Sequence, residues 1–593
     1  SDDPFVATGN AIDAFIFAAL VRKGLAPSPP AEPHTLIRRA YLDVHGLPPG
    51  PEQVERFAST YVSPSLHPSV SLSQRDRGSE SAYAALVDSL LASPRYGERW
   101  ASHWLDVIRY GDTHGFEVNT PRPTAWPYRD YVIQSLNDDK PYDRFIVEQL
   151  TGDQLGIDPA TGFLVAAPAL LGGQIGKDEA SQRQAAADRL HEMIVSVGSG
   201  VMGLTVGCAR CHNHKFDPIS QRDYYQLQAM FAGIEYGERP LPRTPRNAVF
   251  FTLSETPHIG QPGVKLSKVF AGKFVEAKPS HRLYRGDPMQ PREQVSPDVP
   301  AIFGSLKLSA DTPEADRRAA LADWLVDPKN PLTARVIVNR IWQHHFGRGL
   351  VATPSDFGAM GVPPTHPELL DWLAATLIER NWSLKEMHRL ILTSNTYRQA
   401  NRPRDEALAI DAQSQYLWRF PPRRLDMEPI RDTMLATSGV LDLSMGGPGF
   451  LLFKPNTNYV RVYDPKEQWG PAEWRRMVYA HRVRMAVDGV FGAFDCPDAG
   501  QPTPARSRST TGIQALNLFN SGFVAQQAEL LAQRAEREAD CDPLAQIRRV
   551  WMLAYGREAG DDELAAAYRV GAEFGLPAVC RAVLNSNEFL FLP

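Results

Sequence analysis

Apolar residues recur every three or four positions along most of the chain, which is the spacing of an amphipathic helix. In residues 10–24, Ile12, Ile16 and Leu20 share one face, and Asn10 is placed to cap the first turn. The same pattern predicts further helices in three stretches: 34–50, 82–233 and 314–593. We therefore expect a mainly α-helical fold.

The pattern changes between residues 236 and 300, where short apolar runs alternate with Pro and Gly, as is typical of short strands. These runs lie at 246–254, 263–277 and 281–287. The sequence thus predicts two helical domains, residues 1–235 and residues 301–593, joined by a short β-rich linker or insert, residues 236–300.

The composition is that of a globular protein, with 43% hydrophobic and 22% charged residues among 593. The net charge of -5 is small for this length, so we expect no nucleic-acid partner. No apolar run approaches the roughly 18 to 20 residues that cross a bilayer, so we expect no transmembrane segment. The first residues lack both an initiator Met and the pattern of a signal peptide, which predicts a processed or trimmed chain.

The most specific chemical signal is the Cys-x-x-Cys-His motif formed by Cys208, Cys211 and His212. In c-type haem proteins this spacing lets each thiol bond to one vinyl group while the adjacent imidazole binds the iron. The motif predicts one covalent haem c per chain, with His212 as the proximal iron ligand. The distal ligand stays open among several residues: His103, His114, His191, His214, His344, His345, His388 and Met202.

Other interpretations of the motif stay open. The two thiols could bind zinc with His212 or His214, but a closed zinc site needs four ligands and usually two separated pairs. A redox dithiol or a local disulfide is a further alternative, although the strand-to-helix context of such dithiols is missing. Elsewhere, Cys541 and Cys580 flank two predicted helices and are either a disulfide or two buried thiols.

Six residues are candidates for acid–base catalysis: His214 and Asp217 just after the motif, Asp112 and His114 in "RYGDTHGFE", and His344 and His345 in "NRIWQHHFGRG". The first pair would line the haem edge, and the second would transfer protons or hold a metal. The third lies on a helix whose polar face we expect at the domain junction. The structural alternative is helix capping, for example by Ser220, and loop hydrogen bonding.

Long stretches of the chain resemble two known families. The first resemblance is to the planctomycete cytochrome-c-like domain of uncharacterised surface proteins, and it is carried by residues 10–29, 36–49, 96–117 and 204–233. The second is to the planctomycete surface domain that follows it, and it is carried by residues 330–358, 365–373, 388–399 and 509–524. Together the two resemblances cover most of the chain.

The resemblance implies an exported protein, periplasmic or on the cell surface, and it supports haem at Cys208, Cys211 and His212. Such proteins are often encoded beside sulfatase-like proteins, but the family has no established reaction. This chain lacks the upstream cytochrome module of common members and has only a short middle insert. We therefore expect a separate protein as electron donor or acceptor.

The leading hypothesis is a redox enzyme that uses the haem and acts on a carbohydrate-derived substrate, which could be anionic or sulfated. The carbohydrate element rests on the gene association alone. One alternative is an electron-transfer cytochrome without its own substrate, for which the chain is unusually long. The other is a polysaccharide-linked hydrolase or binding protein in which the haem is structural.

Overall fold

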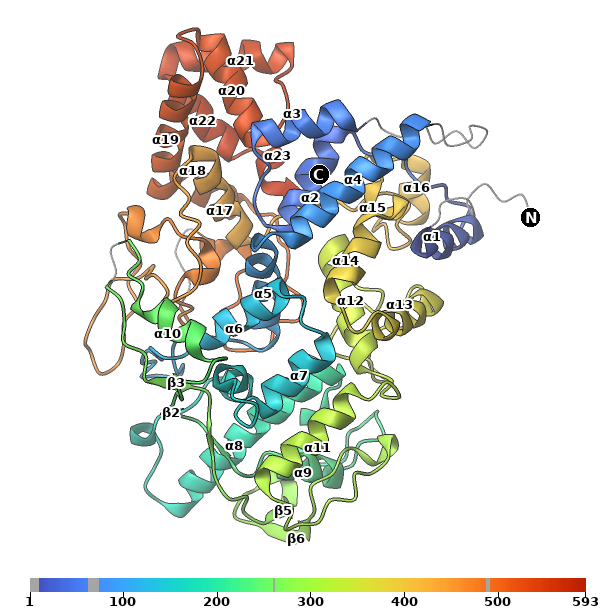
Figure 1. Ribbon diagram of the computed structural model, residues 1–593, viewed down its shortest axis with the longest axis vertical. Coiled ribbons are helices and arrows are strands. Elements are labelled where there is room, and N and C mark those ends of the chain that lie inside the picture. The colour runs from blue at the N-terminus through green and yellow to red at the C-terminus, as the bar shows by residue number, and fades with distance from the viewer. Residues whose placement is uncertain (1–9, 62–73, 260–261, 487–490, 593) are drawn as a thin grey trace.

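The computed structural model describes residues 10–61, 74–259, 262–486 and 491–592 (Figure 1). The first nine residues, which include part of the segment searched for a signal peptide, lie outside the described residues. The structure confirms a mainly helical fold with a few small sheets. Asn10 caps the first helix as predicted, because its side-chain oxygen accepts a hydrogen bond from the Ile12 amide at 3.0 Å.

The helices before the β-containing segment range from one buried face to almost complete burial. They are α1 (Ala11–Arg22), α2 (Pro33–Val44), α3 (Pro51–Thr60), α4 (Gln74–Ala92), α5 (Arg95–Val107), α6 (Trp126–Asn137), α7 (Tyr142–Thr151), α8 (Glu179–Val197) and α9 (Gln221–Ala229). Ser220 caps α9, as expected, by accepting a hydrogen bond from the Asp223 amide at 3.1 Å.

Among the described residues, three two-stranded antiparallel sheets form in and at the start of the middle segment. Their strands are β1 (Ile234–Glu235) with β4 (Lys273–Phe274), β2 (Glu238–Pro240) with β3 (Lys268–Phe270), and β5 (Ser280–Leu283) with β6 (Pro291–Val295). The strand expected within 246–254 is wrong, because this run forms helix α10 (Ala248–Glu255). Phe250, Phe251 and Ser254 are buried on one side of α10, which is a helical rather than an alternating spacing.

Helices dominate again after the middle segment. They are α11 (Glu314–Val326), α12 (Thr333–Phe346), α13 (Pro367–Glu379), α14 (Leu384–Leu392), α15 (Asn395–Arg398), α16 (Asp405–Ile410), α17 (Met427–Ser438), α18 (Gly512–Asn520), α19 (Gly522–Glu538), α20 (Pro543–Tyr555), α21 (Asp561–Phe574), α22 (Leu576–Leu584) and α23 (Asn587–Leu590). A fourth small sheet pairs β7 (Arg423–Arg424) with β8 (Phe591–Leu592).

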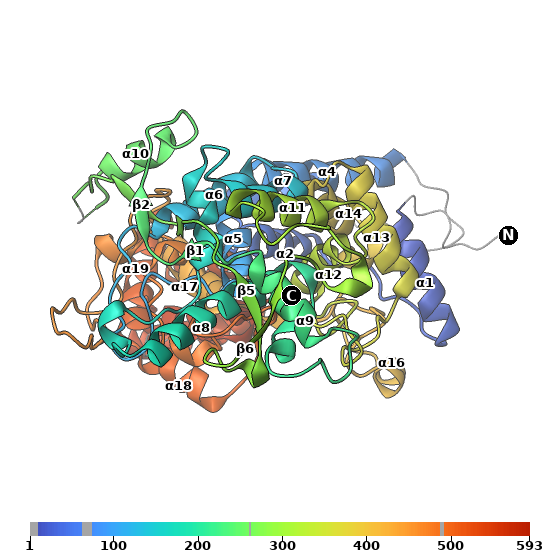
Figure 2. The ribbon, with the colours of Figure 1, turned by 90° about the horizontal axis from the view of Figure 1, so that it is seen from below.

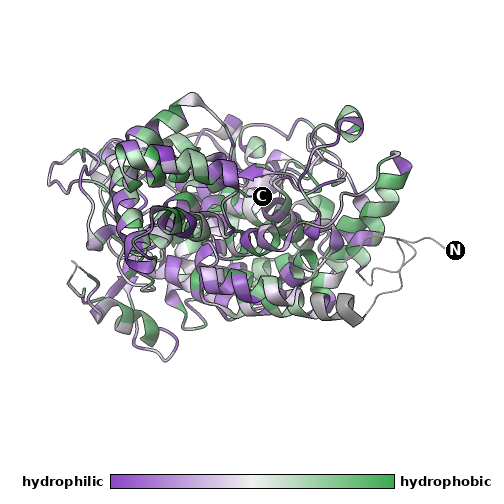
Figure 3. Ribbon diagram, turned by 90° about the horizontal axis from the view of Figure 1, so that it is seen from above, coloured by the Kyte–Doolittle hydropathy of each residue, from purple (hydrophilic) through white to green (hydrophobic). Residues whose placement is uncertain are grey.

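Elements from the two helical regions pack directly against each other. Helix α7 lies along α11, α4 contacts α14, and α2 contacts β8 (Figures 1 and 2). Figure 1 shows α19–α22 at one end of the longest axis and α8, α9, β5 and β6 at the other. The buried apolar residues form a continuous core, and hydrophobic and hydrophilic residues alternate along the helices that surround it (Figure 3).

Among the helices of the described ranges, none combines the length and apolar character needed to span a membrane.

Candidate functional site

The Cys-x-x-Cys-His motif lies on a short 3-10 helix, η5 (Val206–Arg210), and the turn that follows it. Cys208 and Cys211 are free thiols and both are exposed, as is His212. The Nδ1 atom of His212 lies 2.6 Å from the Asn213 carbonyl oxygen. Because a carbonyl only accepts, Nδ1 carries a proton, and in the neutral ring the lone pair is then on Nε2, as in an imidazole that binds a metal.

Helices α8 and α9 hold the motif in place. The Arg210 carbonyl accepts hydrogen bonds from Gln221 Nε2 and from the Tyr225 hydroxyl, each at 3.0 Å. The Arg210 side chain pairs with Asp188 of α8 at 2.7 Å. The Gln221 amide donates to Asn213 Oδ1 at 2.9 Å. These contacts fix the backbone around the motif and leave both thiols exposed.

A cleft of about 440 Å³ opens beside the motif. Gly286 lies against Cys211, because a Cβ atom at this glycine would be 2.8 Å from the Cys211 sulfur. The next three residues and Asp188, the partner of Arg210, line the cleft. Other lining residues come from α8 and the segment before it, among them Leu170, Ile175, Ala180 and Gln184. This volume is within the range of cofactor and small-molecule sites.

The motif residues fit the chemical demands of c-type haem attachment. Two exposed thiols and an imidazole whose Nδ1 is held by a backbone carbonyl occur at the required spacing, next to a cleft. In the described part of the chain, no three His, Cys, Asp or Glu side chains converge on a point where they alone could bind a metal ion.

His214 and Asp217 stabilise the loop that follows the motif. The Asp217 amide donates to His214 Nδ1 at 2.9 Å, so the opposite nitrogen, Nε2, carries the proton and faces the Thr205 hydroxyl at 3.2 Å. The Asp217 carboxylate accepts a hydrogen bond from the Ala359 amide at 2.6 Å. These contacts favour the structural role for both residues.

Asp112 and His114 lie in the loop after α5. The Asp112 carboxylate accepts hydrogen bonds from the Tyr110 hydroxyl at 2.6 Å and from the Arg482 amide at 2.9 Å, so it joins two loops. Burial lowers the pKa of His114 to about 3, and the ring contacts Phe270 edge-on. Asp112 is buried and His114 is half-buried, so the pair is not an open catalytic surface.

His344 and His345 belong to a group of four histidines, of which His103, His345 and His388 are buried and His344 is half-buried. His345 Nδ1 lies 2.6 Å from Asp43 Oδ2, and its Nε2 lies 2.8 Å from His388 Nδ1. His103 and His344 stack with their ring centroids 3.6 Å apart. Within the described residues, no hydrogen bond, ion pair or ring contact joins this cluster to the Cys-x-x-Cys-His motif.

Asp43 anchors this histidine cluster electrostatically. Its carboxylate also contacts Arg423 at 2.6 Å and the Tyr397 hydroxyl at 3.1 Å. Burial alone would raise the pKa of Asp43, but His345 and Arg423 hold it well below its usual range. Burial also lowers the pKa of His388 well below its usual value. The sequence did not single out Asp43, because its partners are distant along the chain.

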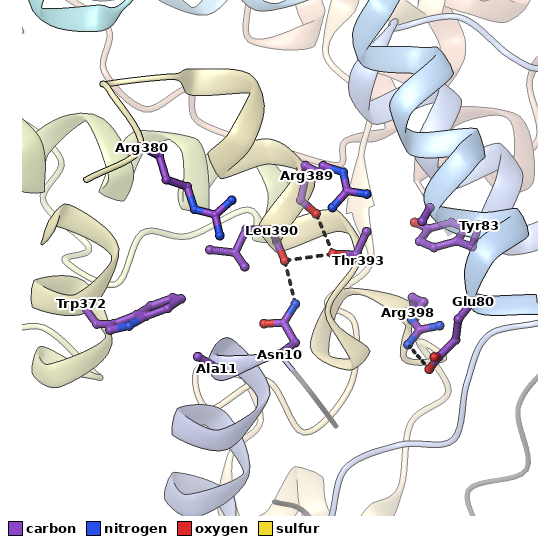
Figure 4. A pocket seen from close by; sticks show the side chains of 11 residues that line it. Asn10, Ala11, Glu80, Tyr83, Trp372, Arg380, Arg389, Leu390, Thr393 and Arg398 are labelled. Atoms are coloured by element: carbon purple, nitrogen blue, oxygen red, sulfur yellow. Dashed lines mark hydrogen bonds and ion pairs between the residues drawn. The ribbon is translucent and has the colours of Figure 1, made fainter. Parts of the chain in front are cut away.

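A second cleft, of about 450 Å³, lies among α1, α4, α13 and α14 (Figure 4). Three arginines and the indole of Trp372 line it. Each arginine has an acidic partner: Arg380 pairs with Glu386, Arg389 with Asp88 at 2.7 Å, and Arg398 with Glu80 at 3.7 Å. The cleft shares no lining residue with the cleft beside the motif.

Cys541 and Cys580 do not form a disulfide in this structure. Both are free thiols, Cys541 exposed and Cys580 buried. The buried-thiol alternative thus describes Cys580 but not Cys541.

Comparison with known families gives two matches. Residues 317–570 match the model PSD1, described as a protein of unknown function (DUF1553). Neither a curated protein nor a solved structure matches the chain. Residues 11–236 match the model PSCyt2, described as a protein of unknown function (DUF1549), so the chain combines a DUF1549 region with a DUF1553 region, in the order of the planctomycete pair that it resembles.

Proposed function

We propose that the protein is an exported mono-haem c-type redox enzyme that holds its cofactor through Cys208, Cys211 and His212. The observation that supports this most is the hydrogen bond from His212 Nδ1 to the Asn213 carbonyl. In the neutral ring, this bond places the lone pair on Nε2, next to two exposed thiols. When bound, haem supplies one-electron redox chemistry.

The chain's own residues would position and shelter this group. Gln221 and Tyr225 hold the Arg210 carbonyl, which keeps the turn between the two thiols in one conformation. The residues after Gly286 form one wall of the adjacent cleft. Because the motif is exposed, a separate electron-transfer protein can approach it, and we propose such a partner in the periplasm or at the cell surface.

The arginine-lined cleft of Figure 4 supports an anionic, carbohydrate-derived substrate. Guanidinium groups bind sulfate and carboxylate groups through paired hydrogen bonds, and an indole face suits a sugar ring. Arg380 and Arg389 are partly exposed, which leaves donors available beyond their acidic partners.

A second candidate function is a polysaccharide-linked hydrolase or binding protein with a structural haem. The observation that favours it is the separation of the two clefts, which have no lining residue in common. An electron carrier without its own substrate is the third candidate, favoured by the exposure of the motif.

The test is a pyridine haemochrome assay with reduced-minus-oxidised spectra, on protein made with the c-type maturation machinery. We expect a c-type α-band that is lost in the Cys208→Ala/Cys211→Ala variant and kept in Cys541→Ala, which removes another exposed thiol. Absence of covalent haem in the unsubstituted protein would refute the proposal, and elemental analysis would then test for zinc.

Carbon monoxide distinguishes the candidate functions once haem is established. Binding of carbon monoxide to the reduced protein indicates an open iron position and supports the enzyme. A six-coordinate iron that excludes carbon monoxide supports the electron carrier instead.

A further inference from the structure

A small cavity lies beside the histidine cluster, between helices α5, α7, α12 and α14. Its volume is about 50 Å³. Most of its wall is apolar, with Trp104, Val107, Phe145, Ile341 and Leu384 among the lining residues. His103, His344 and His388 also line it. No Asp or Glu belongs to the described lining.

The hydrogen bonds of the cluster relate the tautomer of His388 to the protonation of His345. Asp43 is ionised and can only accept, so His345 Nδ1 carries a proton toward it. We take His345 as the neutral imidazole, so that its Nε2 accepts from His388 Nδ1. His388 Nε2 therefore keeps its lone pair, and it has no hydrogen-bond partner among the described residues. In outline this is the relay of a catalytic triad, in which a carboxylate orients an imidazole.

The rings of His103 and His344 likewise have ring contacts but no hydrogen bond within the described part of the chain. Buried polar groups are normally satisfied, and an unsatisfied group calls for an explanation. Here three imidazoles that lack such partners line the same cavity, at a place where the two helical regions meet. A hydrogen-bonding molecule in the cavity would lie next to all three rings.

The wall also restricts the charge and size of that molecule. Burial lowers the pKa of all three histidines well below its usual value, so they are neutral, and an apolar wall disfavours a charged guest. The lining Arg340 already uses both terminal nitrogens on the carbonyls of Gly200 and Ser199. The volume holds about three or four water-sized groups.

We propose that this cavity binds a small uncharged molecule with a hydroxyl or amide group, which donates a hydrogen bond to His388 Nε2. Asp43 and His345 are positioning residues that hold His388 in the required tautomer. The site is independent of haem, so its test stands apart from that of the proposed function.

The experiment uses ¹⁵N-histidine-labelled protein with acetamide, which has four non-hydrogen atoms, and acetate as its charged counterpart of equal size. We expect millimolar acetamide to shift the Nε2 resonance of His388 and the ring resonances of His103 and His344, while acetate leaves them in place. Asp43→Asn should change the tautomer signals of His345 and His388 even where the fold, followed by circular dichroism, is kept.

The matched control is Val107→Phe, which fills the cavity without altering a histidine; Ile341→Phe replaces it should that variant not fold. Either variant should abolish the acetamide shift. The proposal is wrong if acetamide does not shift these resonances. It is also wrong if the shift is the same in the variant whose cavity is filled. Stoichiometric metal bound to the histidines would overturn it as well.

Discussion

Asp43 in α2 and His345 in α12 are 302 residues apart in the sequence, yet their side chains are 2.6 Å apart. Both are buried, and both take part in a network that includes Arg423 and His388. The DUF1549 region supplies the carboxylate and the DUF1553 region supplies its partners. The two regions therefore share a polar core as well as an apolar one.

Replacing Asp43 should strongly destabilise the protein. Asp43→Asn leaves Arg423 buried without its counter-charge, and breaking a buried pair in this way costs about 3–5 kcal/mol. Denaturant unfolding measures the loss. Asp88→Asn is the control, since its pair with Arg389 is largely exposed and should be worth less than about 1 kcal/mol. Equal losses of unfolding free energy for the two variants would contradict a buried ion pair between Asp43 and Arg423.

Stability should fall as the pH drops below neutrality. Burial lowers the pKa of His103, His344 and His388 below the ordinary value of 6.5, so below that pH the unfolded chain binds protons that the folded chain excludes. Each histidine should remove up to about 1.4 kcal/mol of unfolding free energy per pH unit, from about pH 6.5 down toward its folded pKa.

Denaturant unfolding between pH 8 and pH 5 measures this slope. His103→Phe should make the slope shallower because one titrating group is gone. Trp100→Phe, which alters packing on the same rings, should lower stability without changing the slope. A slope that is identical in His103→Phe and the unsubstituted protein would count against the prediction.

Gly286→Ala should disturb the surroundings of Cys211. Gly286 has φ of +80°, which an L-residue adopts at a cost of about 1–2 kcal/mol, and the new methyl group would lie 2.8 Å from the sulfur. We expect the loop to move away, so that alkylation of Cys211 becomes faster in protein made without haem while Cys208 keeps its rate. Peptide mapping by mass spectrometry measures both rates.

Gly512→Ala is the matched control for that experiment, because nothing lies within 4 Å of its Cβ position. It should leave both alkylation rates unchanged. If Gly286→Ala behaves in the same way, the contact between Gly286 and Cys211 does not govern access to the thiol.

Arg380→Gln should weaken binding of a sulfated sugar in the cleft of Figure 4. Loss of one charge-assisted hydrogen bond corresponds to a roughly tenfold weaker affinity, and binding should also weaken at high ionic strength. Titration calorimetry with glucose 6-sulfate measures this, with glucose as the uncharged comparison. Arg335→Gln, at a pair with Asp371 outside the cleft, should have no effect. Equal affinity for glucose and its sulfate would contradict an anion site.

Local chemistry made part of this fold predictable. The helical class, the cap at Asn10 and the cap at Ser220 depend on residues within one or two turns, and the structure has all three. The strand predicted within 246–254 is instead a helix, because aromatic and β-branched residues suit either a strand or a buried helix. Helix α10 begins after Asn247, whose side-chain amide donates hydrogen bonds to Asp158 and to the Pro242 carbonyl. The contact with Asp158 joins residues that are distant in sequence, so the sequence alone does not show it.

The candidate sites, too, could be predicted from the sequence only where they depend on local patterns. The sequence identified His344 and His345 from a polar face on a helix with buried aromatics. It did not pair them with Asp43, His103 or His388, because these contacts depend on the packing of α2, α5 and α14 against α12. Likewise, the cleft beside the motif joins residues 287–289 to α8 and the segment before it, which come together only in the folded chain.

The sheet formed by β7 and β8 bears on the order in which the chain can fold. Arg38 of α2 donates hydrogen bonds to the carbonyls of Ala554 in α20 and of Glu588, just ahead of β8. Helix α2 therefore cannot complete its contacts until residues synthesised far later have appeared. The first helices of the chain therefore reach their final packing only after the last residues have been synthesised.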